Sequence, residues 1–500
     1  MSVLLSGPLI KRNLPENEDE PTPEDRNNTY NLQAFLESSG SFESSEQKDL
    51  RSEVLFKLED LVNQFVKEVY TKVYSDITGA ANYNGKLIAF GSYRYDVCSP
   101  ESDIDSLCIV PQFVKRTDFF TVFYRILSTN QFVKNLVKVE NAYVPIMTMQ
   151  FQGIDVDISF AQLAMQNIDP EMDLSVLDDD NILANVDVQS MRSLNGVRVS
   201  NMILKLVDNT QNFSIFLRFI RLWAKKRGVY GNSYGYLGGV NCALLCVFIC
   251  QKYPTALPSK LILMFFKELM NWNWPDPIYI NTPSTGIQPS WDNNQGSAGK
   301  NDKMPIITPA YPAMNSMAKA TKSTRERMIH EFKRGYKYTE RVLNEGTEWK
   351  TLIEPSHFFV NYKKYVRVQI WATNAEEFNK WVQTVEAQIR KLTLALESVR
   401  FMTAVYAYPQ HFDRKDDEGH EYSSSFYLGL EYNIPKEESV ERRIDISEQA
   451  QKFIDDMYES PNRTNQMGLF LYLIDKMIIQ DYLCPEGRPP KKHRHQKTTQ

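Results

Sequence analysis

Two short apolar runs with acidic residues between them constrain the fold of this chain more than any other feature. The first run ends at Phe90, and the second begins at Leu107, just after Asp103-Ile104-Asp105. Because alternate residues of a strand share a face, Asp103 and Asp105 are predicted to project together while Ile104 points into the core. Two neighbouring carboxylates repel each other unless a cation lies between them. The segment therefore predicts a metal site at a strand.

A phosphate site is predicted beside these acids. The first apolar run breaks at Gly91-Ser92, and free backbone N–H groups at such a turn or helix start can bind phosphate. A later helical segment is a second candidate, because it carries five basic residues shortly before the Gly238-Gly239 turn: Arg218, Arg221, Lys225, Lys226 and Arg227. Such a run is usually a solvated helix face, and contact with phosphate is the competing interpretation.

A further acidic strand is predicted at residues 144–160, which read as a strand pair turning at Gln152-Gly153. Its second arm places Asp155 and Asp157 on one face. A third carboxylate on a neighbouring strand is what the first two acids need to hold two metal ions. The alternative is that both acids form the solvent side of an edge strand, and the pattern alone favours that alternative.

Composition limits the class of protein. The 500 residues predict two to four domains, and 42% apolar with 24% charged residues is typical of a soluble globular protein. A net charge of -5 requires any nucleic-acid surface to be local. The longest apolar run, residues 243–250, is too short for a membrane span, and the N-terminus lacks a secretion signal.

The six cysteines form no Cys-x-x-Cys pair or disulfide framework. Three of them, Cys242, Cys246 and Cys250, follow helical spacing in an apolar segment, so they are predicted to pack in a core. A reducing intracellular compartment is therefore expected.

The spacing of apolar residues divides the rest of the chain into predicted segments. Residues 11–48 are acidic and polar, which predicts a loosely ordered leader with at most a short helix at 32–36. An amphipathic helix is predicted at 47–73, a second at 118–129, an acidic connector at 169–187, and further helices up to residue 344. After Trp349 the order becomes β-α-β-β-α-β, the ferredoxin-like pattern of RNA recognition motifs, without their base-stacking aromatic signature.

A basic tail closes the chain and carries Arg488, Lys491, Lys492, Arg494 and Lys497. Nuclear import or RNA contact is one interpretation of this tail, and a disordered, solubilising segment is the other. The sequence favours neither.

Several segments together resemble the nuclear eukaryotic poly(A) polymerases, within the polymerase-β-type nucleotidyltransferase superfamily. They are FGSYR, MRSLNGVRV, LWAKKRGVYGN, GYLGGV, YPTALPS, NWNWPDP and MPIITPAYPAMNS, in that order from residue 90 to residue 316. The resemblance extends over most of the chain, from the helix at 47 to the last predicted strand.

The resemblance implies an α+β multidomain fold with three domains. We assign the nucleotidyltransferase α/β domain to residues 47–190, the central helical domain to 191–350 and the RNA-recognition-motif-like domain to 351–484. The leader occupies 1–46 and the basic tail 485–500. The active cleft is expected between the first and third domains, above the second.

The resemblance also implies site residues. Asp103, Asp105 and Asp157 match the catalytic, metal-binding carboxylates, which hold two Mg²⁺ or Mn²⁺ ions, whereas Asp155 matches no ligand. The expected nucleotide contacts are these three acids together with Phe90, Gly91, Ser92, Ser99, Ile104, Asn195, Arg221, Tyr230, Asn232, Gly239 and Val240.

Two positions depart from the family pattern. Arg221 stands where the family has a triphosphate-binding Lys, and a planar guanidinium is not equivalent to an ammonium group. Thr148 stands where the family has a second Lys, so the usual triphosphate clamp lacks a cation there. Lys225 or Lys226 could compensate.

The resemblance implies a template-independent adenylyltransferase that extends mRNA 3′ ends with ATP. It implies a nuclear location, a monomeric catalytic unit, a cleavage and polyadenylation complex as partner, and no membrane. The alternatives are a terminal transferase with another nucleotide preference and a non-catalytic RNA-binding scaffold of the same fold. The three acids argue against the scaffold, because a scaffold has no use for mutually repelling carboxylates.

Overall fold

The computed structural model describes residues 13–281, 290–291, 301–414, 419–434, 444–479 and 483. Its first layer is a five-stranded sheet in the order β1-β2-β5-β4-β3. The strands are β1 (Lys86–Ala89), β2 (Ile104–Val110), β3 (Val133–Val139), β4 (Ile146–Phe151) and β5 (Ile154–Gln162). Only β2 and β5 run parallel; the other neighbouring pairs are antiparallel.

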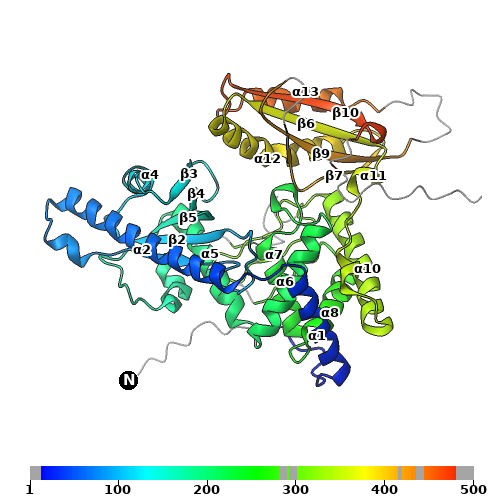
Figure 1. The fold of residues 1–500 in the computed structure, drawn as a ribbon, viewed down its shortest axis with the longest axis horizontal. Coiled ribbons are helices and arrows are strands. Elements are labelled where there is room, and N and C mark those ends of the chain that lie inside the picture. The colour runs from blue at the N-terminus through cyan, green and yellow to red at the C-terminus, as the bar shows by residue number, and fades with distance from the viewer. Residues whose placement is uncertain are drawn as a thin grey trace, which may run out of the picture.

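Both faces of this sheet are covered, because the side chains of β2 alternate between two cores. Ile104 and Cys108 pack with helix α2 (Ser45–Tyr74), whereas Leu107 and Ile109 pack with helix α5 (Val188–Lys205). In Figure 1, α2 lies along the sheet at one end of the molecule. The predicted helix at 47–73 and the predicted strand pair at 144–160 are confirmed, with left-handed Gln152 and Gly153 at the turn.

The prediction of a loosely ordered leader is wrong for residues 13–46. Residues Pro23–Ser38 form helix α1, whose Thr22 and Asp25 make a reciprocal capping box. Leu32 and Leu36 are fully buried in the largest core, and α1 packs against helix α8 (Pro258–Asn271). The polar composition of this segment did not predict the helix. Only two buried apolar side chains, one turn apart, anchor it to the core.

The central region is helical as predicted. It contains α5, α6 (Thr210–Lys226), α7 (Gly239–Lys252), α8 and α10 (Lys322–Glu345). Cys242 and Cys246 are fully buried on α7 and Cys250 is largely buried, so their predicted packing role is confirmed. No helix among the described residues is long and apolar enough to cross a bilayer.

The last region has the predicted ferredoxin-like order. It comprises β6 (Lys364–Ala372), α12 (Ala375–Glu397), β7 (Met402–Ala407), β9 (Tyr422–Tyr432), α13 (Ser447–Tyr458) and β10 (Met467–Asp475). The antiparallel sheet order is β10-β6-β9-β7, with the short β8 (Phe412–Asp413) beside β9. Figure 1 places this sheet beyond the central helices, away from the first sheet.

The short helix α11 (Phe358–Asn361) and its aromatic side chains cover one face of this second sheet. This helix places Phe358 and Phe359 against the buried Tyr365 and Tyr427. These rings form a small separate core, so they are occupied in packing.

Four details differ from prediction or lie outside the described residues. Strand β3 was not predicted, because its burial is low and no strict alternation marks it. The predicted helix at 118–129 is split by a π-helical turn, Phe119–Phe123, and the connector at 169–187 contains two 3₁₀ turns. The basic tail lies outside the described residues.

Candidate active site

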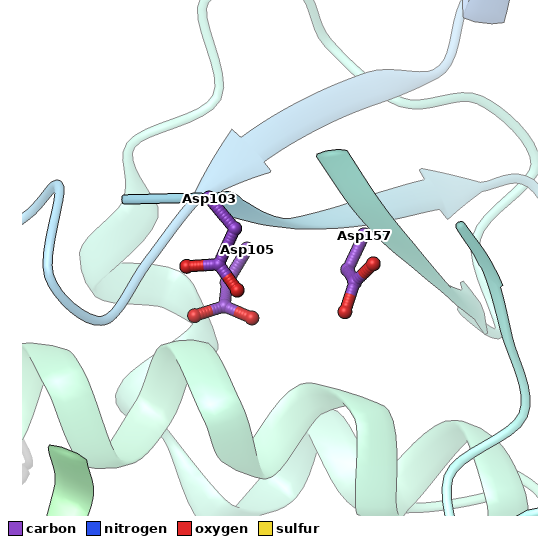
Figure 2. A group of neighbouring side chains, drawn as sticks. All are labelled: Asp103, Asp105 and Asp157. Carbon is purple, nitrogen blue, oxygen red and sulfur yellow. The ribbon is translucent and has the colours of Figure 1, made fainter. Parts of the chain in front are cut away.

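The site is built where β2 and β5 run side by side. Asp105 and Asp157 are register partners on these parallel strands, and Asp103 immediately precedes β2. Ligand oxygens of the three carboxylates lie within 4.8 Å of one another. Figure 2 shows Asp103 and Asp105 together, with Asp157 facing the same space from the neighbouring strand. The predicted grouping of these three acids is therefore present.

Asp155 faces solvent, which is the alternative that the sequence analysis gave for the acids of this strand. It is exposed on β5 and does not belong to the group of three. Strands β4 and β3 continue the sheet beyond β5, so β5 is an interior strand. The edge-strand interpretation of this segment is wrong.

Burial and mutual repulsion disfavour the ionised forms of two carboxylates of the triad, Asp105 and Asp157. Burial, followed by repulsion from Asp103 and Asp157, raises the pKa of Asp105 to about 7. Burial and the charges of Asp103 and Asp155 raise the pKa of Asp157 to about 6. Oxygen ligands of this kind suit Mg²⁺ and Mn²⁺, and a bound divalent ion would favour the ionised carboxylates. The donor set therefore fits divalent metal.

We expect metal-free protein to lose stability as the pH rises from about 4 to about 7. In this window folded Asp105 keeps a proton that the unfolded chain has released, so deprotonation favours unfolding. Thermal melts in EDTA should therefore show Asp105→Asn becoming more stable than the unmutated protein as the pH rises. A constant difference between the two proteins across this window would contradict the raised pKa.

A cavity of about 520 Å³ opens beside the triad. It is lined by ten of the predicted site residues: Phe90, Gly91, Ser92, Asp103, Asp105, Asn195, Arg221, Tyr230, Gly239 and Val240. The five-stranded sheet of β1 to β5, α5, α6 and the start of α7 all contribute to this lining.

Two buried polar atoms of the lining lack partners among the described residues. They are Oδ1 of Asn195 and Nε of Arg221. A buried polar atom without a hydrogen bond costs free energy, so such atoms in a cavity wall indicate a ligand with polar groups. An acceptor and a donor of this kind, next to three carboxylates, fit a metal-bound nucleotide.

Gly91 is constrained by both its backbone and its neighbour. Its φ is +62°, and a Cβ there would lie 3.2 Å from Oδ2 of Asp105. We expect Gly91→Ala to cost about 1 kcal/mol of stability through the left-handed backbone. We also expect reduced activity, because the added methyl group crowds Asp105. Gly153→Ala is the control, since Gly153 is also left-handed but has open space around it. Similar activity losses in both variants would contradict the role of crowding.

Some predicted contacts lie elsewhere. Ile104 is buried in the core under the sheet. Asn232 does not line the cavity; its Nδ2 donates to Oδ1 of Asn241 at 3.3 Å and to the Ser316 carbonyl at 3.1 Å. Ser99 lines a second cavity of about 520 Å³, together with Lys225 and Lys226.

Thr148 lies directly across from Asp157, as its register partner on β4. A Lys at this position, which the resemblance implies for the family, would therefore lie beside the triad. Lys225 and Lys226 line the second cavity and not the first, whereas Arg221 lines both. Arg221 is thus the basic side chain of α6 that reaches the cavity lined by Asp103 and Asp105, whose lining does not include Asp157.

Sequence reasoning did not single out several residues of the cavity wall. Thr308, Met314 and Asn315 come from a segment distant in sequence, and Tyr143 stacks on Arg192 at 4.0 Å. The MPIITPAYPAMNS motif was the one available signal for the first three. Arg192 falls within the MRSLNGVRV segment, whereas nothing in the sequence pattern marked Tyr143 or its contact with Arg192.

Comparisons with known proteins cover most of the chain. Residues 15–207 match the family described as poly(A) polymerase nucleotidyltransferase domain, and residues 212–355 match the poly(A) polymerase central domain. Residues 357–421 match the poly(A) polymerase predicted RNA binding domain.

The curated relatives that match this chain are also named poly(A) polymerases. Nuclear poly(A) polymerase 1 of Arabidopsis thaliana is 39% identical over 439 residues, which are 87% of this chain and 60% of that protein. The poly(A) polymerase of Dictyostelium discoideum is 37% identical over 465 residues, 91% of this chain and 57% of that protein. The chain thus spans little more than half the length of these relatives. Three consecutive domain matches and these identities establish that the chain belongs to the poly(A) polymerase family.

Proposed function

We propose that this chain is a template-independent polynucleotide adenylyltransferase that transfers AMP from ATP to the 3′-hydroxyl of mRNA. In this reaction the 3′-oxygen forms a bond to the α-phosphorus, and the bond from the α-phosphorus to the β-phosphate bridging oxygen breaks. Pyrophosphate leaves. The observation that carries the proposal is the triad of carboxylates beside a cavity whose wall contains unpartnered Asn195 and Arg221 atoms.

Asp103, Asp105 and Asp157 would hold two divalent ions, Mg²⁺ or Mn²⁺. Such ions activate the attacking hydroxyl and offset charge on the phosphates. Asp157, on the strand next to the Asp103-Asp105 pair, would take up the proton that the hydroxyl loses. A bound divalent ion would keep this carboxylate ionised and therefore able to accept a proton.

The remaining side chains would bind and orient the nucleotide. The turn at Gly91-Ser92 offers the Ser92 hydroxyl and backbone N–H groups to the terminal phosphates. Arg221 would add positive charge, and Asn195, Tyr230 and Val240, which line the same cavity, would contact the sugar and base. Preorganised donors of this kind stabilise charge that develops on the phosphates.

RNA with a free 3′ end is the proposed second substrate, and the region from β6 to β10 is the proposed RNA-binding domain. The relatives' names support a nuclear location, and the proposed partner is a cleavage and polyadenylation complex. We propose that the catalytic unit is a monomer. The domain boundaries at residues 191, 351 and 485 remain part of this proposal.

The test is primer extension with purified protein, an oligo(A) primer, each NTP separately and Mg²⁺ or Mn²⁺. We expect extension with ATP and little with the other nucleotides. Extension with UTP in preference to ATP would replace the proposal with a terminal transferase of another specificity. No extension with any nucleotide would favour a non-catalytic scaffold.

A further inference from the structure

The loop that leads from the Gly91-Ser92 turn to Asp103 is held by its backbone carbonyls. Side chains from outside the loop donate hydrogen bonds to the carbonyls of Tyr95, Asp96, Val97, Cys98, Ser99, Ser102 and Asp103. The donors come from two helices, α2 and α6, which are far apart in the sequence. Such regular attachment fixes the course of the backbone up to the first acid of the triad.

Arg218 makes the attachment from α6. Its guanidinium is buried and donates to the Asp96 carbonyl at 2.6 Å and to the Cys98 carbonyl at 2.7 Å. It also donates to the Ser41 carbonyl, and its centre lies 4.3 Å from the Phe42 ring. One side chain thus joins the central helix, the loop and the α1–α2 junction.

Arg51 makes the attachment from α2, nearer to the acids. Its side chain is only 3% exposed and pairs with the equally buried Glu43 of the α1–α2 junction. Its two terminal nitrogens donate to the carbonyls of Ser99, Ser102 and Asp103. The last of these belongs to a member of the triad itself.

We propose that Arg51 is a positioning residue for the metal site, held in place by Glu43 and assisted by Arg218. It sets the backbone at Asp103 and thereby the direction of that carboxylate. Arg51 and Arg218, together with the loop carbonyls that they bind, form what we call the clamp. The α1–α2 junction, which composition assigns to a loose leader, is part of this clamp because it supplies Glu43 and the Ser41 carbonyl. The inference deepens the proposed function, because it concerns the carboxylates that would hold the metal ions.

The chemistry of the guanidinium explains why an arginine is needed. Its planar fork can satisfy a carboxylate and several carbonyls at once, in fixed directions. A Lys at this position would keep the charge but would offer one ammonium group to acceptors on both sides. Partners that orient metal ligands typically change metal affinity or activity 10–100-fold when they are removed, although they never touch the metal.

The test measures Mn²⁺ binding by electron paramagnetic resonance, without RNA or nucleotide. We expect Arg51→Met to raise the Kd for Mn²⁺ about 10–100-fold. Arg227→Met is the matched control, because Arg227 is also buried and paired with a buried Glu331, but it donates to the Glu354 carbonyl and not to the loop. The control should melt at a lower temperature while its Mn²⁺ affinity stays at the unmutated value.

Wild-type Mn²⁺ affinity in folded Arg51→Met would overturn the proposal, as would an equal loss in the Arg227 control. If Arg51→Met does not fold, Arg51→Lys takes its place, with weakened Mn²⁺ binding expected and unchanged binding contradictory. Failure of the proposed function is seen separately, as Mn²⁺ binding by the unmutated protein without primer extension. Absence of Mn²⁺ binding by the unmutated protein would overturn both.

Discussion

Replacing Asp157 with alanine should reduce AMP transfer at least about 10³-fold, because groups that act as one catalytic unit fail together when one is removed. Asp157 is the register partner of Asp105, and its carboxylate completes the three oxygens that lie within 4.8 Å of one another. Two acids alone would hold the ions less tightly and would leave no carboxylate at the proposed proton-accepting position. The measurement is the initial rate of oligo(A) extension at saturating ATP.

Asp155→Ala is the matched control for this loss. Asp155 lies on the same strand and the same face, two residues away, but it is exposed and outside the triad. Its removal deletes a repelling charge near Asp157, so the pKa of Asp157 should fall. The maximal rate should stay within about threefold, the range of surface substitutions away from reacting groups. Equal losses in both variants would contradict the assignment of Asp157.

The second large effect is expected at Arg221. Arg221→Ala should raise the apparent KM for ATP about 10–100-fold, since hydrogen bonds to charged groups contribute about 1.5–3 kcal/mol. Arg221→Lys should raise it far less, because the positive charge remains near the triphosphate. Arg221 lines the cavity beside the triad, and its Nε has no partner among the described residues. Steady-state kinetics with varied ATP measures both effects.

Arg221 also contacts the loop between Gly91 and Asp103, and this contact is a second way in which it can affect the site. Nη1 of Arg221 donates to the Val97 carbonyl at 2.9 Å, so part of its effect could pass through the loop. Loss of that contact affects both substitutions, whereas loss of charge affects only alanine. Equal KM changes in the two variants would remove the assigned role in triphosphate binding. Lys226→Ala is the control on the same helix, because Lys226 is exposed and borders the second cavity only.

Local patterns were enough to predict most elements and the triad's strands. The alternation around Asp105 and the turn at Gln152-Gly153 depend on neighbouring residues, and both were confirmed. The choice between Asp155 and Asp157 could not be made from periodicity, since both share a face. The family resemblance made that choice, and its physical basis is the long-range pairing of β5 with β2, which sets Asp157 opposite Asp105.

Features that depend on distant segments escaped sequence reasoning. Helix α1 is anchored by the burial of Leu32 and Leu36 against helices that follow more than 150 residues later. The clamp of Arg51 and Arg218 consists of side chains bound to backbone carbonyls, which carry no sequence signal. Ser99 and Asn232 were expected at the nucleotide cavity from resemblance alone, and the structure places neither in its wall.

The most direct test of the central claim is anomalous diffraction from crystals grown with Mn²⁺ and an ATP analogue that cannot be cleaved between the α- and β-phosphates. We expect manganese peaks among the carboxylates of Asp103, Asp105 and Asp157, with the triphosphate reaching Gly91-Ser92. Manganese bound elsewhere, or an analogue outside the cavity that Asn195 and Arg221 line, would contradict the claim that these residues form an adenylyltransferase site.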